Sequence, residues 1–271
     1  MDASGFEACS LKAQEMNTVK TTVIVPAYNE EDGLALHKNT LFALDNSKPK
    51  ITVLFCTLNE EKNLPLILPY IPYYIDEVVI IDGHSKDNTV SLAKKLFPKA
   101  KIFFQPGKGK GDALRFGIEK ATGDIIVMLD ADGSMSMEEI PRFIEPLLKG
   151  NDFVKGSRFL PGGGTVDMSL HRIFGNWVFT TLTNIFHSCR YTDLCYGYNA
   201  FWKESFSKVM FKGNGFEVET EINIKIRKAG LKVVEVPSYE DLRKNGVGNL
   251  HSFKDGWRIL KTIFSELSQP V

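Results

Sequence analysis

Apolar and polar residues alternate in blocks along this chain, and the blocks have two kinds of spacing. Short runs rich in Val, Ile, Leu and Phe predict strands, whereas segments with an apolar residue every three or four positions predict helices. Strands and helices alternate from residue 51 to residue 159, which is typical of a parallel, doubly wound sheet in a single α/β domain. We expect strands within residues 21–31, 51–61, 76–82, 101–105, 124–134, 152–159 and 232–240, and helices within residues 63–74, 89–97, 111–121, 137–150, 171–186, 217–230 and 253–267.

One strand pattern occurs twice. Thr21–Glu31 reads TTVIVPAYNEE and Ile51–Glu61 reads ITVLFCTLNEE, so each β-branched run stops at Asn-Glu-Glu. The second copy runs into a helix and then into the strand that ends at Asp82, with short connections, so we expect it to supply the strand of the active fold. We therefore interpret residues 1–47 as an N-terminal extension with a partial duplication, and residues 48–271 as the main domain. Chance likeness between two strand ends is the alternative.

Composition narrows the class of protein. The 271 residues can bury a large core, and 33 basic residues balance 33 acidic ones, so net charge does not favour nucleic-acid binding. The four cysteines form no C-x-x-C pair, which favours a reduced, intracellular chain. The N-terminal segment lacks the apolar core of a signal peptide, and no window reaches the roughly 18 apolar residues of a spanning helix. We expect a cytoplasmic protein that lies at most peripherally on the cytoplasmic face of a membrane.

Carboxylates follow three of the expected strands. Glu60, Asp82 and the pair Asp130 and Asp132 lie where the chain leaves a strand, and ligands of open parallel sheets bind beyond these carboxyl ends. The D-A-D pair places two anions one residue apart, which is tolerated when they are exposed or when a hard divalent cation joins them. A solvated turn is the alternative for an isolated D-x-D. Behind a buried strand, and with Asp82 ending another, the pair favours a Mg²⁺ or Mn²⁺ site.

The sequence excludes other common nucleotide and metal motifs. The glycine-rich segment QPGKGKGDA does not match the P-loop G-x-x-x-x-G-K-[ST], and it does not give G-x-G-x-x-G at the first strand-to-helix turn. The five histidines form no H-x-x-H or H-E-x-x-H pair. Three arginines do lie near strand ends or loops, namely Arg158, Arg172 and Arg243, and Arg suits bidentate phosphate binding. Each alone would be a surface charge, but with a carboxylate pair for a metal they predict a diphosphate clamp.

These motifs, in this order, resemble an inverting glycosyltransferase of family 2 with the GT-A fold. The resemblance is strongest to polyprenyl-phosphate glycosyltransferases of the dolichol-phosphate mannosyltransferase type, and it covers roughly residues 50–265. It implies a GT-A domain over residues 48–271, with a Rossmann-like, mostly parallel sheet flanked by helices. It rests on the segments TLNEEKNLP, VVIIDGHSKDNT, GKGKGDALRFG, VMLDADGS, VKGSRF, TDLCYGYNAFW, GFEVETEI and EVPSYEDLRKNGVGNLHSFKDGWRIL.

The resemblance also implies roles for individual residues. Asp130 and Asp132 would hold Mg²⁺ or Mn²⁺ and, through it, the diphosphate of a GDP- or UDP-hexose. Arg172 would bind the acceptor phosphate, and Asp193 occupies the position that resembles the family's catalytic carboxylate. The implied catalytic residues are Asp132, Arg158 and Asp193. The implied nucleotide-sugar site consists of Thr57, Leu58, Glu60, Asp82, Asp130, Ala131, Arg158 and Arg243.

The implied reaction is displacement at the anomeric carbon of a nucleotide sugar, with inversion, by a polyprenyl phosphate. A phosphate monoester has a second pKa of about 6, so it is largely a dianion at neutral pH and needs no general base. The alternative acceptor is a sugar or small-molecule hydroxyl, for which Asp193 would act as the base. A catalytically silent nucleotide-binding protein is a further alternative, because residues usual in the family are replaced at Cys56, Leu58 and Ser134.

The last expected helix has a pattern that bears on the acceptor. An apolar stripe beside basic side chains can lie on an anionic membrane surface, where a lipid acceptor would be found. Packing of the stripe against the protein core is the alternative. The stripe consists of Trp257, Leu260, Phe264 and Leu267, and the basic residues are Lys254, Arg258 and Lys261.

Overall fold

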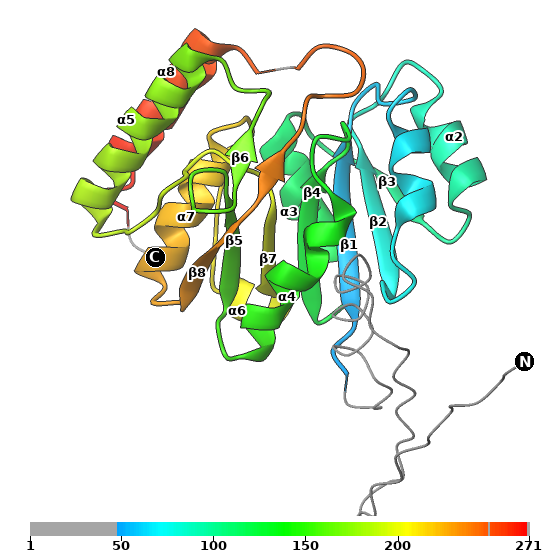
Figure 1. Cartoon of the computed structure of the whole chain (residues 1–271), viewed down its shortest axis with the longest axis horizontal. Coiled ribbons are helices and arrows are strands. Elements are labelled where there is room, and N and C mark those ends of the chain that lie inside the picture. The colour runs from blue at the N-terminus through cyan, green and yellow to red at the C-terminus, as the bar shows by residue number, and fades with distance from the viewer. Residues whose placement is uncertain (1–47, 249, 270–271) are drawn as a thin grey trace, which may run out of the picture.

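The central sheet has seven strands in the computed structural model, which describes residues 48–248 and 250–269 (Figure 1). Their order is β3-β2-β1-β4-β7-β5-β8, and among these seven only β7 runs antiparallel to its neighbours. Two further short strands, β6 and β9, pair with each other in parallel. The strands are β1 Ile51–Thr57, β2 Glu77–Asp82, β3 Lys101–Phe104, β4 Ile125–Asp130, β5 Phe153–Ser157, β6 Gly164–Thr165, β7 Asn199–Trp202, β8 Val233–Pro237 and β9 Tyr239–Glu240.

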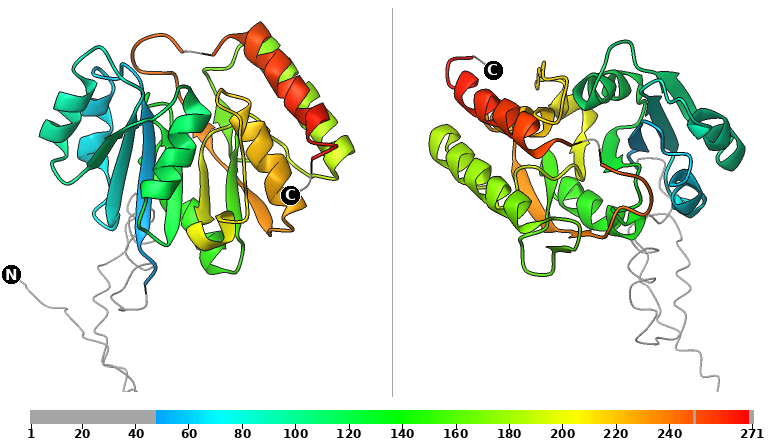
Figure 2. Two further views of the ribbon diagram at one scale, coloured as in Figure 1. Left: turned by 180° about the vertical axis from the view of Figure 1, so that it is seen from behind. Right: turned by 90° about the horizontal axis from the view of Figure 1, so that it is seen from above.

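Helices cover both faces of the sheet (Figures 1 and 2). One face packs against the 3₁₀ turns η2 and η3 and against α2 and α4, and the other packs against α3, α6 and α7. Helices α5 and α8 pack against each other and against α7, on the β8 side of the sheet. The helices are η2 Leu64–Leu66, η3 Leu68–Tyr70, α2 Thr89–Leu96, α3 Lys110–Lys120, η4 Met137–Glu139, α4 Ile140–Leu148, α5 Leu170–His187, α6 Lys203–Phe206, α7 Val218–Lys228 and α8 Ser252–Ser265.

The central strands form because their sequences are almost entirely apolar. Strands β1, β2 and β4 are buried on both faces, as continuous apolar runs in parallel sheets are. Strand β1 lies between the other two, with Thr57 opposite Asp82 and Cys56 opposite Asp130. This register brings the polar ends of three strands to one edge of the sheet, where the sequence predicts a ligand site.

Most expected elements are present, and the mostly parallel sheet flanked by helices is confirmed. Residues 63–74 were expected to form one helix, and this was wrong. They contain two short 3₁₀ turns, because Pro65 and Pro69 lack the amide protons that a continuous helix needs. The sequence reasoning also missed β7, which pairs between β4 and β5. The expected strand within residues 21–31, and the extension that contains it, lie outside the described residues.

The glycine-rich turn before α3 is shaped by a close backbone contact. A Cβ at Gly109 would lie 2.1 Å from the carbonyl oxygen of Asn214, and a Cβ at Gly111 would lie 2.0 Å from that of Gly213. Gly109 also has a φ of 92°, a conformation that favours glycine. The glycines therefore let the start of α3 pack on the loop before α7, where Gly111 N donates to the carbonyl oxygen of Asn214 at 3.0 Å.

Candidate active site

Three groups of charged side chains include residues that follow strands of the central sheet. Each group has one basic side chain between two carboxylates, and we refer to it as a triad named after its basic residue. The groups are the Arg243 triad (Arg243 with Glu60 and Asp132), the Lys110 triad (Lys110 with Asp130 and Glu219) and the Arg158 triad (Arg158 with Asp193 and Glu240).

The Arg243 triad joins the end of β1 to the D-x-D turn after β4. Arg243 Nη1 lies 3.2 Å from Asp132 Oδ2, and its Nη2 contacts Glu60 Oε1. Asn63 Nδ2 donates to the other Glu60 oxygen at 2.5 Å, and Ser134 Oγ donates to Asp132 Oδ1 at 2.7 Å. Burial raises the pKa of Glu60, and the hydrogen bond from Asn63 and the charge of Arg243 only partly offset this effect. The guanidinium thus holds together groups that are 111 and 183 positions away from it in sequence.

The Lys110 triad holds the first aspartate of the D-x-D pair. Lys110 Nζ lies 2.7 Å from Asp130 Oδ1 and 2.7 Å from Glu219 Oε1. Burial alone would lower the pKa of Lys110, but the charges of Asp130 and Glu219 outweigh burial and raise that pKa above its ordinary value. Burial also raises the pKa of Glu219, against the opposing charge of Lys110. The ammonium therefore stays charged between its two partners.

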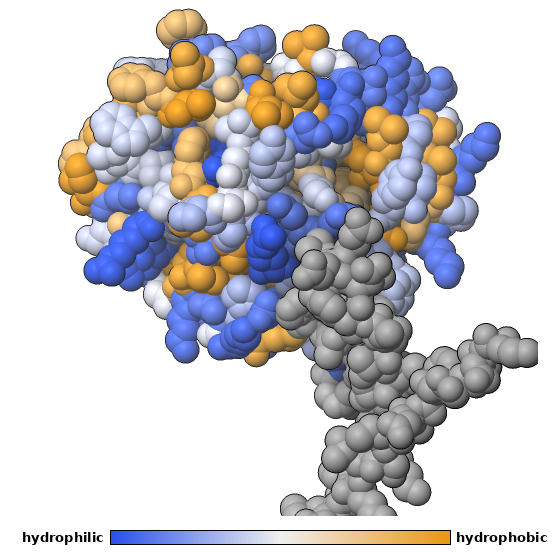
Figure 3. Space-filling model, viewed as in Figure 1, coloured by the Kyte–Doolittle hydropathy of each residue, from blue (hydrophilic) through white to orange (hydrophobic). Residues whose placement is uncertain are grey.

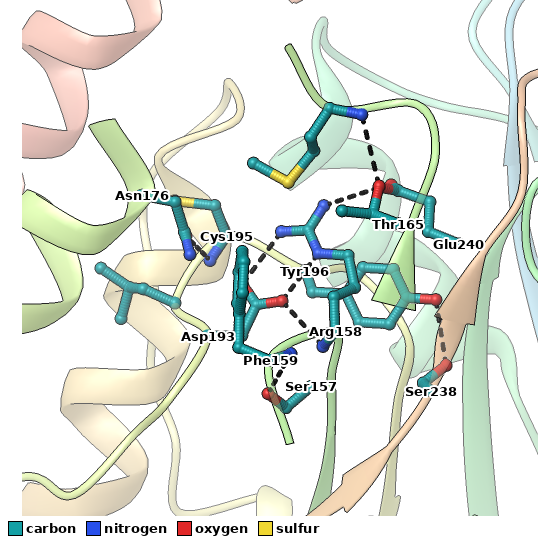
Figure 4. Close-up of polar contacts among 12 residues, drawn as sticks. Ser157, Arg158, Phe159, Thr165, Asn176, Asp193, Cys195, Tyr196, Ser238 and Glu240 are labelled. Atoms are coloured by element: carbon teal, nitrogen blue, oxygen red, sulfur yellow. Dashed lines mark hydrogen bonds and ion pairs between the residues drawn. The ribbon is translucent and has the colours of Figure 1, made fainter. Parts of the chain in front are cut away.

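The Arg158 triad is buried more deeply than the other two, and its contacts are drawn in Figure 4. Arg158 Nε and Nη2 donate to the two oxygens of Asp193 at 2.7 and 2.9 Å, and Nη1 donates to Glu240 at 2.9 Å. The guanidinium carbon lies 4.6 Å from the centroid of the Tyr196 ring. Burial alone would raise the pKa of Asp193, but the charge and hydrogen bonds of Arg158, together with the charge of Lys155, outweigh burial and hold that pKa below its ordinary value. Asp193 is therefore an ionised carboxylate whose two oxygens are both engaged by one guanidinium.

The other residues predicted to bind the nucleotide sugar also lie at the ends of β1, β2 and β4. Asp82 is fully buried and accepts hydrogen bonds from Thr57 Oγ1 at 3.0 Å and from Ser85 Oγ at 2.6 Å. Leu58, which follows β1 directly, is 41% exposed. Ala131 is buried between the two aspartates of the turn. The carboxylate of Asp82 is thus engaged within the protein, whereas Leu58 presents its side chain to the surface of the site.

The sequence reasoning did not identify Lys110, Glu219 and Glu240 as members of the site. Lys110 stands between two glycines of QPGKGKGDA, and the spacing of that segment argues only against a P-loop. Glu219 lies within α7 and pairs with Lys110 across 109 positions. Glu240 pairs with Arg158 across 82 positions. No local sequence pattern predicts ion pairs between residues so far apart in sequence. The segments that contain these residues are nevertheless among those that carry the family resemblance.

The D-x-D carboxylates fit a hard divalent cation in chemistry and in charge. Asp130 and Asp132 offer oxygen ligands at a turn, with 34% and 18% of their side chains exposed. In the part of the chain that the structure describes, no group of three or more His, Cys, Asp or Glu side chains could hold a metal by itself. Water and substrate oxygens would therefore complete the shell, as is usual for Mg²⁺. With every carboxylate ionised, the two triads that contain these aspartates carry one excess negative charge each, and one divalent cation balances both.

Helix α5 exposes large apolar side chains and buries three polar ones, although Phe179 and Leu182 also pack inward. Its buried positions include Asn176, Thr180 and Thr183, whereas Phe174 and Trp177 are 65% and 61% exposed. A surface helix ordinarily turns its apolar stripe to the core and its polar residues to water. The outer side of α5 is therefore suited to an apolar environment.

Helix α8 continues this apolar surface (Figure 3), where apolar side chains gather at the upper left over α5 and α8. Ile259 and Ile263 pack inward, whereas the expected stripe of α8 is largely exposed, with Trp257 at 69%. The rings of Phe186 and Phe264 join the two helices, with centroids 5.3 Å apart. The exposed residues, which we call the α5–α8 face, are the apolar Leu170, Phe174, Trp177, Ile185, Phe186, Phe253, Trp257, Phe264 and Leu267 and the basic Lys254, Arg258 and Lys261.

The predicted acceptor residue Arg172 lies in the first turn of α5 and belongs to none of the three triads. Its Nη1 pairs with Asp167 Oδ2 at 3.1 Å, and both side chains are 31% exposed. Arg172 is thus on the helix that carries the α5–α8 face. Within the described residues, no helix combines the length and the apolarity that crossing a bilayer requires.

Sequence comparison finds known relatives over most of the chain. A family model described as "Glycosyl transferase family 2" matches residues 22–210. The glycosyltransferase AglJ of Haloferax volcanii is 33% identical over 223 residues, which cover 79% of this chain and 71% of AglJ. The dolichol-phosphate mannosyltransferase of Pyrococcus furiosus is 30% identical, and the match covers 80% of this chain but 62% of that protein. The undecaprenyl-phosphate mannosyltransferase of Micrococcus luteus is 30% identical over 69% of this chain and 82% of its own length.

Structural comparison supports the fold. The glucosyl-3-phosphoglycerate synthase of Mycobacterium tuberculosis, solved with Mn²⁺, UDP and glucosyl-3-phosphoglycerate, superposes with a TM-score of 0.65. The match covers 92% of this chain and 88% of that chain, at 21% sequence identity. At this identity the likeness establishes the GT-A architecture and not the substrate.

Proposed function

Because the chain belongs to glycosyl transferase family 2, we propose that it transfers a hexose from a nucleoside-diphosphate sugar to a polyprenyl phosphate, with inversion at the anomeric carbon. The observation that carries the proposal is the meeting of Glu60, Arg243 and the D-x-D turn at the carboxyl edge of the sheet. The acceptor is proposed from the α5–α8 face and from the names of two relatives, which are mannosyltransferases of dolichol phosphate and undecaprenyl phosphate.

For the donor, Asp130 and Asp132 would hold Mg²⁺ or Mn²⁺. The bound cation would stabilise the negative charge that develops on the leaving nucleoside diphosphate. Arg243 lies within reach of Asp132 and would place a second positive charge near the same phosphates. A GDP- or UDP-hexose fits this arrangement. The proposed wall of the nucleotide pocket consists of Thr57, Leu58, Glu60, Asp82 and Ala131.

A phosphate acceptor suits the state of Asp193. Both oxygens of this carboxylate accept hydrogen bonds from Arg158, and its pKa is held low, so it is a poor proton acceptor. A phosphate monoester is already largely a dianion at neutral pH and needs no base. We therefore assign Arg158 and Asp193 to the rigid support of the site. A hydroxyl acceptor would require Asp193 to leave Arg158 first.

A lipid acceptor suits the α5–α8 face. Its exposed rings would enter the boundary between head groups and acyl chains, and the basic side chains of α8 would lie against anionic head groups. Arg172, in the first turn of α5, would then meet the phosphate of the lipid. The protein would associate peripherally with the cytoplasmic face of a membrane through this surface.

The test is a transfer assay on the full-length protein with Mn²⁺. The donors are radiolabelled GDP-mannose and UDP-glucose, and the acceptors are a short polyprenyl phosphate in detergent and, separately, 3-phosphoglycerate. We expect labelled product with the polyprenyl phosphate only. Transfer to 3-phosphoglycerate but not to the lipid would overturn the proposed acceptor.

The metal assignment is tested by Asp132→Asn. We expect this variant to lose metal-dependent donor binding, because it removes one ligand and half of the charge of the D-x-D pair. Asp241→Asn is the matched control, because Asp241 pairs with Lys244 in the neighbouring loop and is outside the pair. Unchanged turnover in Asp132→Asn would remove the assignment.

A further inference from the structure

The two triads that contain the D-x-D pair share an asymmetry. In each, the aspartate is the more exposed carboxylate, with 34% of the Asp130 side chain and 18% of the Asp132 side chain accessible. The glutamate on the other side of the base is nearly buried, at 7% for Glu219 and 8% for Glu60. The base therefore bridges an inner glutamate and an outer aspartate.

The third triad lacks this outer member. The side chains of Arg158, Asp193 and Glu240 are 2%, 0% and 10% exposed. Both carboxylates of that triad are less exposed than Asp130 and Asp132, so neither corresponds to an outer aspartate. The asymmetry is therefore specific to the two triads at the proposed metal.

We propose that Lys110 and Arg243 are resident counterions of the D-x-D pair, and that a divalent cation displaces each base from its outer aspartate while its inner glutamate retains it. This inference rests on the proposed function, because it concerns the same metal. It assigns to Lys110 a role as a positioning residue that sets the affinity of the site for the metal.

The exchange follows from distance and charge. Lys110 Nζ is 2.7 Å from Asp130 Oδ1. Mg²⁺ binds an oxygen at about 2.1 Å, so an ammonium and a metal on the same oxygen would lie at most about 5 Å apart, where like charges repel strongly. The metal and the ammonium therefore compete for this carboxylate.

The displaced base does not become an unpaired buried charge. Lys110 keeps its contact of 2.7 Å with Glu219, and Arg243 keeps Glu60 and a hydrogen bond of 2.8 Å to the carbonyl oxygen of Asn245. Loss of every partner of a buried charge would be costly, so the inner glutamates make the exchange reversible. Gly111 N donates to the carbonyl oxygen of Asn214 at 3.0 Å and so anchors the backbone beside Lys110, and we expect the side chain alone to move.

The test measures binding of MnCl₂ alone, without nucleotide, by titration calorimetry or by the electron paramagnetic resonance of free Mn²⁺. Lys110→Met keeps the length of the side chain and removes the competing charge. We expect it to bind Mn²⁺ about tenfold more tightly than the wild type. Lys110→Arg keeps the charge and should bind as the wild type does. Lys108→Met, an exposed lysine of the same loop, controls for the general loss of one positive charge.

Whether Lys110→Met binds Mn²⁺ more tightly or more weakly than the wild type decides between this proposal and a purely structural role of Lys110. If Lys110 only holds Asp130 in place for the metal, Lys110→Met will bind Mn²⁺ more weakly, and weaker or unchanged binding overturns the exchange. If Lys110→Met does not fold, Arg243→Met tests the same exchange at the other aspartate, with the same expected sign. A wild-type protein that binds no Mn²⁺ even with UDP or GDP present would instead overturn the metal assignment of the proposed function.

Discussion

Asp193→Asn would remove the charge that holds Arg158 in the core while it keeps the volume of the side chain. The wild-type carboxylate is 0% exposed and accepts hydrogen bonds from Arg158 Nε, Nη2 and backbone N at 2.7, 2.9 and 3.2 Å. Breaking a buried ion pair by removing one partner costs about 3–5 kcal/mol of the free energy of unfolding. Glu240 would still pair with Arg158 at 2.9 Å, so we expect the lower end, about 3 kcal/mol.

The assay is urea unfolding followed by circular dichroism, with activity measured on the folded fraction. Glu145→Gln is the matched control, because Glu145 pairs with Lys149 on the exposed side of α4, and a surface pair of this spacing contributes only about 0.3–0.5 kcal/mol. We expect Asp193→Asn to keep most of its activity on a phosphate acceptor. A change in stability below about 1 kcal/mol, together with a loss of about 10²–10⁴-fold in kcat, would refute the reasoning and identify Asp193 as a base.

The pKa of Asp193 gives the same experiment a pH dependence. Arg158 holds this pKa below its ordinary value of 3.8, so the folded state binds the proton less readily than the unfolded state. The stabilisation is therefore fully present above the unfolded pKa and is lost as the pH falls through the folded pKa. The difference in unfolding free energy between the wild type and Asp193→Asn should be constant above about pH 5 and should shrink as the pH is lowered below about 4.

Three further predictions concern the acceptor and the N-terminal part of the chain. Arg172→Ala should raise the KM for a polyprenyl phosphate about tenfold or more and leave nucleotide-sugar binding unchanged, because a hydrogen bond to a charged group contributes about 1.5–3 kcal/mol; a loss of donor affinity alone would contradict its role. The double variant Trp177→Ser and Phe253→Ser should no longer sediment with anionic vesicles, because burying each large apolar side chain contributes roughly 2 kcal/mol to membrane binding. Unaltered sedimentation would exclude the α5–α8 face as the membrane-binding surface. A protein truncated to begin at Ser47 should fold and bind a nucleotide sugar, since all seven strands of the central sheet follow this residue; a folded truncation that binds no donor would mean that the first copy of the strand builds the site.

The N-terminal half of the sheet could be predicted because its signals are local. Strands β1, β2 and β4 are continuous apolar runs that end in polar turns, and both features are visible within a dozen residues. Strand β7 has no such signal. Its sequence, NAFW, is short and does not alternate, and it is extended because β4 and β5 pair with it from both sides. A prediction made from neighbouring residues misses such a strand, because tertiary pairing rather than local sequence makes it extended.

The D-x-D aspartates and the arginines of two triads could be predicted from the sequence. Lys110, Glu219 and Glu240, and all of the pairings between the charged groups, could not. Asp130 and Asp132 follow a buried strand, and this position alone identifies them. The identity of the base that holds each one depends on which distant loop the fold brings over it. Gly109 and Gly111 show how indirect the signal is, because their role is a backbone contact that places the lysine between them. The spacing of Gly109 and Gly111 therefore has a physical cause in packing.

The pairing of β1 bears directly on the doubled strand. This strand pairs in parallel with β2 on one side and with β4 on the other, over six residue pairs each, so both of its edges are used. The turn that follows it carries Glu60 to Arg243. The similar residues 21–31 lie outside the described residues. Any other strand could take the position of β1 only by displacing it from its pairing with both β2 and β4. A further strand could otherwise join the sheet only at β3 or β8, and neither is next to the strand that carries the D-x-D turn. We therefore propose that the second copy alone supplies the strand of the donor site, and we expect donor binding to survive the loss of residues 1–46.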